Sequence, residues 1–262
     1  MKRFYLLMLL LASTGFIFLS GCEKKSSFQK LVWSDEFNEP GLPDTSKWSY
    51  NVGRGCPQNC GWGNNELQYY TEKRRENARV ENGRLVIEAR KETFEDAAYT
   101  SARLVTKNKA DWKYGRVEAR AKLPSGIGTW PAIWMLGANI DEAGWPGCGE
   151  IDIMEHKGSR LNKIYGTLHF PGYSGDNGVG GTIITPNAAT EFHIYSIEWD
   201  ETAIKFFVDG FNYFTFKNHT SVPYHQNFYI ILNLAMGGNF GGAVDPLFKR
   251  AAMEIDYIRV YQ

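Results

Sequence analysis

The sequence has no excess of charge of either sign, because 29 lysines and arginines are matched by 29 aspartates and glutamates. Nucleic-acid-binding proteins normally carry a basic excess, so this balance gives no support for a nucleic-acid partner. Charged residues make up 22% of the chain and hydrophobic residues 43%, which excludes a disordered polymer or a coiled coil. No segment sustains a helical period and no internal repeat is visible, which argues against a helical bundle or a solenoid.

The apolar run Phe4–Leu19 is shorter than the roughly 20 residues that a membrane-spanning helix needs. Lys2 and Arg3 precede this run and small residues end it, which is the pattern of a secretion signal. Its end, Leu19-Ser20-Gly21-Cys22, resembles the lipobox of bacterial lipoproteins, in which cleavage precedes a cysteine that is then acylated.

We therefore expect residues 1–21 to be a lipoprotein signal peptide and residues 22–27 to be a polar tether. Cys22 would carry the lipid and anchor an exported protein to a membrane, at the outer membrane on its periplasmic side or at the cell surface. The alternative is an ordinary signal peptide in which Cys22 is incidental.

Cysteine is scarce, with four residues in the chain. If Cys22 carries lipid, Cys56, Cys60 and Cys148 remain, so at least one thiol stays free or pairs between chains. Export permits disulfides, and Cys56 and Cys60 would close a small ring around a turn. Three reduced thiols are the alternative, and this spacing without a second pair is a poor zinc signal.

Aromatic residues are abundant, at 15% of the chain, which suits a β-rich core or a surface that stacks on flat apolar ligands. Residues 115–123 alternate strictly between apolar and charged side chains, the pattern of a half-buried strand. Turns at 200–202 and 209–210 predict hairpins. The chain is expected to form one all-β domain over residues 28–262, a large antiparallel sandwich. Further strands are expected at 83–90, 193–199, 203–208, 211–216, 226–234 and 253–261.

The segment Glu150-Ile151-Asp152-Ile153-Met154-Glu155 interleaves acids with apolar residues, which indicates a strand. On a regular strand Glu150 and Asp152 share one face and Glu155 points the other way. A β-bulge between Asp152 and Glu155 would bring all three acids to one face, and bulges gather at active sites. Mutual repulsion then raises at least one pKa and leaves a protonated acid beside an ionised one, as glycosidic-bond cleavage requires. The alternatives are an acidic edge strand in solvent and a calcium site.

Tryptophans near these acids favour a sugar ligand, because sugar rings present apolar C–H faces that pack on aromatic planes. Trp130 and Trp134 lie shortly before the acids on the expected neighbouring strand, and Trp112 and Trp145 flank this region. We predict substrate contacts from Trp112, Trp130, Trp134 and Trp145 and, for the sugar hydroxyls, from Asn64, Arg103 and His169. Core positions are expected instead for Trp33, Trp48 and Trp199.

The acidic segment resembles the active-site signature of glycoside hydrolase family sixteen, in the bulged form with two residues between the aspartate and the second glutamate. The resemblance to the laminarinase branch extends over nearly all of the mature chain, through residues 63–70, 99–103, 114–120, 128–134, 165–169 and 254–261. It implies a jelly-roll sandwich of two curved antiparallel sheets, with a substrate groove on the concave face. It also implies endo-hydrolysis of β-1,3-glucan with retention of configuration. Mixed-linkage lichenases and xyloglucan transglycosylases lack the extra residue.

By position, the resemblance makes Glu150 the nucleophile, Glu155 the acid/base and Asp152 the assisting residue that holds and tunes the nucleophile. His169 is expected to hydrogen-bond Glu155 or the sugar, and His156 to face away from Glu155. Catalysis of this kind is expected to need no cofactor.

Similar laminarinases carry a structural calcium ion on the convex face, and the matching residues are Glu36, Gly83 and Asp256. The first two would supply mainly backbone carbonyls, as hard oxygen ligands. The alternative is that Asp256 caps a turn or pairs with Arg259.

Other functions stay open at this point: hydrolysis of mixed-linkage glucan, agarose, porphyran or carrageenan, a non-catalytic carbohydrate-binding sandwich, or a calcium-dependent adhesion protein. The acidic trio argues against a lectin, which does not need such an arrangement. We expect a monomer whose partners are a polysaccharide and, through Cys22, a membrane.

Overall fold

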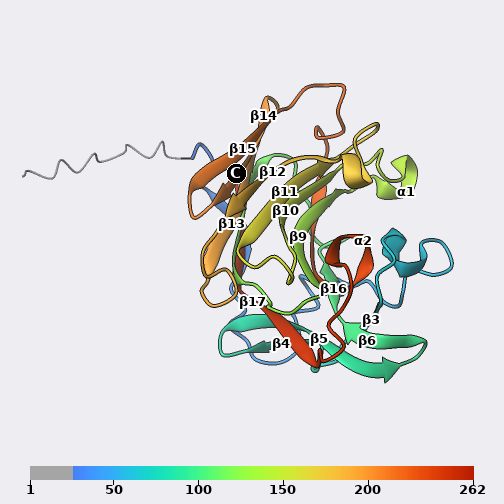
Figure 1. Cartoon of the computed structure of the whole chain (residues 1–262). Helices are drawn as coiled ribbons and strands as arrows, with labels where there is room; N and C mark the ends of the chain where they lie inside the picture. The colour runs from blue at the N-terminus through green and yellow to red at the C-terminus, as the bar shows by residue number, and fades with distance from the viewer. Residues whose placement is uncertain (1–25) are drawn as a thin grey trace, which may run out of the picture.

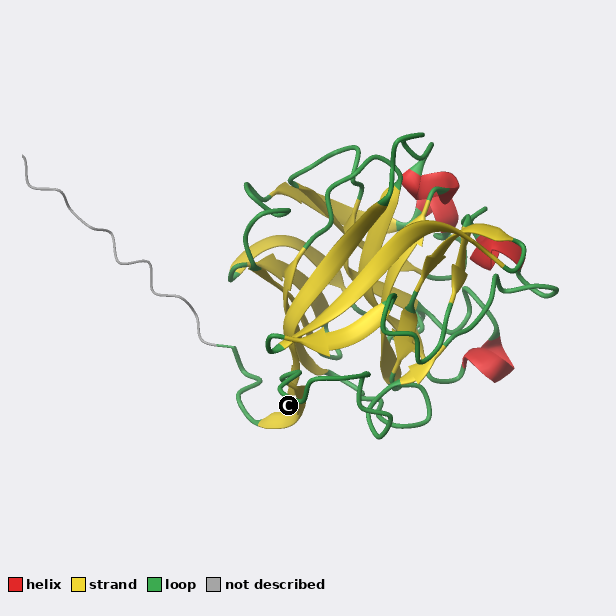
Figure 2. Cartoon of the chain, turned by 90° about the horizontal axis from the view of Figure 1, so that it is seen from below, coloured by secondary structure: helices red, strands yellow, loops and turns green. Residues whose placement is uncertain are grey.

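The computed structural model describes residues 26–262, as two β-sheets that pack face to face with four short helical turns between strands (Figures 1 and 2). The predicted signal peptide, Cys22 and most of the tether lie outside the described residues. The prediction of an all-β sandwich is confirmed. Within the described part of the chain, no helix is long and apolar enough to cross a membrane.

The larger sheet has ten strands, eight of them in the order β15-β14-β13-β8-β17-β5-β6-β3, with β1 paired to β17 and β4 to β5. All neighbours are antiparallel except β3 and β6. The strands are β1 (Leu31–Asp35), β3 (Gln68–Tyr70), β4 (Ala78–Glu81), β5 (Arg84–Phe94), β6 (Ala97–Ser101), β8 (Gly115–Lys122), β13 (His193–Trp199), β14 (Ala203–Val208), β15 (Phe211–Lys217) and β17 (Arg250–Tyr261).

The second sheet has seven strands in the order β12-β11-β10-β9-β16-β7-β2. They are β2 (Ser49–Tyr50), β7 (Arg103–Val105), β9 (Thr129–Gly137), β10 (Glu150–His156), β11 (Lys163–His169), β12 (Val179–Ile184) and β16 (Phe228–Met236). The helical turns are η1 (Cys60–Gly63), α1 (Ile140–Ala143), η2 (Gly175–Asn177) and α2 (Gly238–Gly241).

The core lies between the two sheets and follows the predicted alternation. On β8 the side chains of Val117, Ala119 and Ala121 are buried, whereas the charged residues between them point to the other face. Strand β16, near the middle of the seven-stranded sheet, is buried along its whole length. Trp48 and Trp199 are core residues, as expected.

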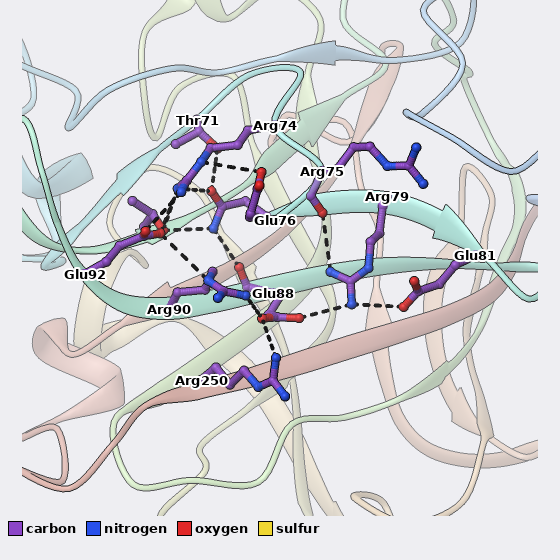
Figure 3. Close-up of polar contacts among 12 residues, drawn as sticks. Thr71, Arg74, Arg75, Glu76, Arg79, Glu81, Glu88, Arg90, Glu92 and Arg250 are labelled. Atoms are coloured by element: carbon purple, nitrogen blue, oxygen red, sulfur yellow. Dashed lines mark hydrogen bonds and ion pairs between the residues drawn. The ribbon is translucent and has the colours of Figure 1, made fainter.

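Alternating charges on the outer face of β4 and β5 form an ion-pair network (Figure 3). Arg74 donates two hydrogen bonds to Glu92, of 2.7 and 3.0 Å, and lowers the pKa of that carboxyl to about 2. Arg79 reaches across the β4–β5 hairpin to Glu88 at 3.1 Å. Such paired charges favour one strand register on a face that packing does not specify.

The structure also shows which of the three cysteines within residues 26–262 form a disulfide. Cys56 and Cys60 form a disulfide, and Cys148 is a buried free thiol. The ring predicted between residues 56 and 60 is therefore present, and Cys60 is also the first residue of the turn η1.

Candidate active site

Strand β10 contains the predicted β-bulge. Asp152 pairs with Thr167 of β11, but Glu155, three residues later, pairs with Tyr165, only two residues away. The pairing with β9 shifts at the same place. Because of the extra residue, the three acids share the face away from the core, whereas Ile151, Ile153 and Met154 belong to the core.

The two glutamates of the cluster each accept a hydrogen bond from a tryptophan. The indole N–H of Trp145 donates to Oε2 of Glu150 at 2.9 Å, and that of Trp130 donates to Oε1 of Glu155 at 2.9 Å. Hydrogen bonds of this kind stabilise the ionised form of each carboxyl. The two acids are thus held by different donors.

Asp152 lies between the glutamates and faces His169, which pairs with Glu150 in the β10–β11 ladder. Nε2 of His169 is 3.1 Å from Oδ2 of Asp152 and 3.8 Å from Oε1 of Glu150. His169 therefore lies next to Asp152 and Glu150 and not, as expected, next to Glu155. Its expected hydrogen bond to the sugar stays a prediction. The ligand atoms of Glu150, Asp152 and His169 all lie within 4.8 Å of one another, close enough to share a proton or hold an ion.

Burial raises the pKa of all three carboxyls. The pKa of Glu150 rises to about 8, first because the group is buried and next because Asp152 repels its charge. Burial and Glu155 raise the pKa of Asp152 well above its usual range. Burial also raises the pKa of Glu155, against the opposing effect of the Trp130 hydrogen bond. With the pKa of Glu150 at about 8, the cluster therefore retains a proton at neutral pH, and acid catalysis on a glycoside needs such a proton.

His156 follows Glu155 but lies in the opposite environment. It is fully buried, neither ring nitrogen has a hydrogen-bond partner among residues 26–262, and burial lowers its pKa to about 4. Because neighbouring side chains on a strand point to opposite faces, this burial agrees with the expectation that the imidazole faces away from Glu155.

On one side of the acids, aromatic side chains surround Trp130. The rings of Trp130 and Phe240 are 5.1 Å apart, Phe240 and Tyr165 are also 5.1 Å apart, and Nζ of Lys157 lies 3.9 Å from the centre of the Phe240 ring. The residues predicted to contact substrate do not include Phe240, Tyr165 or Lys157. The glycines on both sides of Phe240 were the available signal, because they let α2 approach Trp130 closely.

On the other side of Trp130 along β9, Trp134 donates its indole N–H to Asn233 at 2.7 Å. The guanidinium of Arg103 lies 4.7 Å from the centre of the Trp134 ring. Asn64 lies in the neighbouring loop, where its amide is 3.4 Å from Oε1 of Glu66. The structure thus places Arg103 and Trp134 together, and their substrate-binding roles stay predictions.

Trp112 does not fit the predicted contact with substrate. Its side chain is buried in the core, 5.2 Å from the ring of Trp33, and its backbone pairs with Phe228. The backbone of Trp112 thus joins the end of β16, in the sheet that holds the acids, but its side chain packs against Trp33 in the core between the sheets.

The carboxylates of the predicted calcium site are already paired. Arg259 donates two hydrogen bonds of 2.9 Å to Glu36, and Arg120 donates one of 2.6 Å to Asp256. The alternative pair Asp256–Arg259 is therefore wrong in its partner. Backbone ligands from Glu36 and Gly83 to a calcium ion stay a prediction.

A model of glycosyl hydrolases family 16 matches residues 65–259. The chain belongs to this family. The beta-glucanase of Rhodothermus marinus is 50% identical over 253 residues, which cover 91% of this chain and 87% of that protein. The glucan endo-1,3-beta-glucosidase of Cryptopygus antarcticus is 40% identical over 87% of this chain and 90% of its own length. The crystal structure of the laminarinase catalytic domain of Thermotoga maritima has a TM-score of 0.84 and 46% identity, covering 90% of this chain and 99% of that one.

As a family 16 glycoside hydrolase, the chain should depend on both glutamates of the bulged strand. We expect Glu150→Gln and Glu155→Gln each to lower kcat at least about a hundredfold, because each removes a nucleophile or an acid/base. Melting temperatures should stay equal or rise, because each change removes charge from a crowded, buried cluster. Asp152→Asn should cost less than Glu150→Gln. The measurements are steady-state kinetics and thermal unfolding.

Near-normal activity of either glutamine variant would refute its assigned role. For Glu150→Ala, added azide should occupy the place of the carboxylate and yield an inverted glycosyl azide. A retained product would instead contradict Glu150 as nucleophile.

Proposed function

We propose that this enzyme hydrolyses internal β-1,3 linkages of laminarin-type glucans with retention of configuration. The observation that carries the proposal is the bulge in β10, which puts Glu150, Asp152 and Glu155 on one face in a buried cluster that retains a proton. The similarity to laminarinases and endo-1,3-β-glucosidases supports this choice of linkage.

In the proposed mechanism Glu150 attacks the anomeric carbon and forms a glycosyl-enzyme. Burial and Asp152 raise the pKa of Glu150, and the nearby imidazole of His169 and the Trp145 indole N–H oppose this rise. The attack uses the form of the cluster in which Glu150 is ionised and Glu155 holds the proton. Glu155 gives its proton to the leaving glycosidic oxygen and then takes a proton from the incoming water. Burial raises the pKa of Glu155 and so favours the protonated form that donates this proton. Both the nucleophile and the proton come from the chain, so we expect no catalytic cofactor.

A panel of laminarin, curdlan, lichenan and agarose tests the linkage. We expect oligosaccharide release from laminarin and curdlan, with products that show the β-anomer first, as retention requires. Chromatographic sizing and time-resolved NMR of the anomeric protons are the measurements. Preference for lichenan would favour a mixed-linkage glucanase, release from agarose alone would favour the galactan-cleaving branch, and binding without cleavage would favour a lectin.

We also propose a structural calcium ion that ties the chain ends together through backbone carbonyls. Asp256 is the residue at which the β17–β8 register shifts, and it pairs with neither β5, whose ladder ends at Ile255, nor β1, whose ladder begins at Ile258. Glu36 follows the last residue of β1, and Gly83 precedes the first of β5. Three backbone segments thus begin or end near this shift in register, and their carbonyl oxygens are the ligands that we propose for a hard cation.

Calcium should therefore raise the melting temperature and a chelator should lower it. A ligand that binds only the folded state at a hundredfold excess over Kd adds about 2.7 kcal/mol to the free energy of unfolding. Thermal unfolding with calcium, with EDTA and with magnesium as a control measures this. A melting temperature indifferent to calcium would remove the site, and activity at low temperature should survive chelation.

We propose, finally, that the protein is exported and anchored through lipid on Cys22. The basic start, the apolar run and the lipobox-like end of residues 1–22 support this proposal. Cys22→Ser should abolish incorporation of labelled fatty acid and move the enzyme from the membrane to the soluble fraction. Fractionation and labelling of whole cells measure both. Unchanged membrane association of the serine variant would contradict the anchor.

A further inference from the structure

The loop that carries the Cys56–Cys60 disulfide brings a tryptophan to the sheet that holds the acids. Trp62 lies in η1, directly after the disulfide ring, and is partly exposed. The neighbouring backbone contacts α2, since Asn239 N–H donates to the carbonyl of Asn64 at 2.8 Å, and Figure 1 shows this segment beside α2. Neither the predicted site nor the proposed mechanism includes Trp62.

Trp62 forms the outer layer of a stack. The guanidinium of Arg103 lies 4.6 Å from the Trp62 ring centre and 4.7 Å from that of Trp134. Nε of Arg103 is buried and has no hydrogen-bond partner within residues 26–262. The three side chains come from a loop, from β7 and from β9, and no ladder holds the loop member in place.

The register locates this stack relative to the acids. Trp134 pairs directly with Asp152, whereas Arg103 pairs with Asn233 on β16, one strand further out. The strand order β10-β9-β16-β7 puts Arg103 three strands from the acids, about 14 Å at the ordinary strand spacing. The stack therefore extends from the catalytic strand to a position more than one sugar residue away.

The backbone conformation of Trp62 indicates that the surrounding residues hold it in place. Its φ of 52° is in the left-handed region, which a bulky side chain rarely adopts. Gly61 and Gly63 on either side are also left-handed, with φ of 63° and 77°. Such conformations persist only where the surroundings over-determine them, and they cluster at binding sites.

Several contacts over-determine this loop. The disulfide closes residues 56–60, and the carbonyl of Arg54 accepts a hydrogen bond of 2.8 Å from Gly61 N–H. The indole N–H of Trp62 donates to the carbonyl of Gly53 at 3.3 Å. A Cβ on Gly55 would lie 2.4 Å from the carbonyl oxygen of Asn59 and 3.3 Å from the Trp62 ring, so only glycine fits there.

We propose that Trp62 is the stacking platform of a distal subsite for a glucan chain, and that the Cys56–Cys60 disulfide positions it. Arg103, stacked between the rings of Trp62 and Trp134, links this platform to the strand next to the acids. This proposal rests on the proposed β-glucan substrate and adds chain-length preference to it. A subsite so far from the acids acts only on chains long enough to reach it.

Laminari-oligosaccharides of increasing length test the subsite. Trp62→Ala should lower kcat/KM for the longest oligosaccharides roughly tenfold to a hundredfold, the loss of one well-packed aromatic contact. The shortest oligosaccharide that the wild type cleaves should change by less than about twofold. Trp62→Phe should keep most of the activity on long chains. Phe211→Ala, an exposed aromatic residue on β15 of the other sheet, is the matched control and should change neither.

The disulfide is tested by Cys56→Ser/Cys60→Ser, alone and combined with Trp62→Ala. The serine variant should lose activity on long chains only, and the combined variant should be no worse than Trp62→Ala, because both act through one ring. If Trp62→Ala lost equal activity on short and long chains, or lost none, Trp62 would not be the platform. Additive losses would overturn the role of the disulfide. Failure of the wild type to cleave any member of the series would instead refute the proposed substrate.

Discussion

Repulsion among three closely spaced carboxyls on one strand, two of them buried and Glu150 partly buried, is the constraint on which the rest of this site depends. Glu150, Asp152 and Glu155 share a face because β10 contains an extra residue, and burial removes the water that would screen their charges. The cluster relieves that repulsion by retaining a proton. A retained proton beside a carboxylate is also what general acid catalysis requires, so the same electrostatic stress that costs stability supplies the chemistry.

The neighbouring strands supply hydrogen-bond donors and a nearby imidazole, which reduce the free-energy cost of burying the acids. Strand β9 provides Trp130 as donor to Glu155, and β11 provides His169 beside Asp152. Each donor sits on a strand with a fixed register to β10, so its position follows from the sheet. The donor to Glu150, Trp145, comes from the loop after α1. The hydrophobic core between the two sheets supports this arrangement.

Substrate contacts at a distance from the acids depend less on the sheet and more on loops. Phe240 approaches Trp130 because glycines surround it, and Trp62 reaches Arg103 because glycines and a disulfide force a left-handed turn. Loops positioned by a rigid scaffold are the usual place where specificity varies within a fold. In this enzyme the proposed catalytic acids belong to a strand of the sheet, and the proposed chain-length preference belongs to the loop.

The sequence by itself determined the all-β class, most long strands and the bulged acidic segment, because period-two alternation and the spacing of Glu150 and Glu155 are local properties. It also limited the disulfide to two alternatives. Tertiary structure alone decided that Trp112 enters the core, that Arg120 and Arg259 take the carboxylates of Asp256 and Glu36, and that Trp62 stacks on Arg103. Each of these contacts joins residues from distant strands and loops. Strand order and packing decide which residues meet in this way, and neighbours along the chain do not.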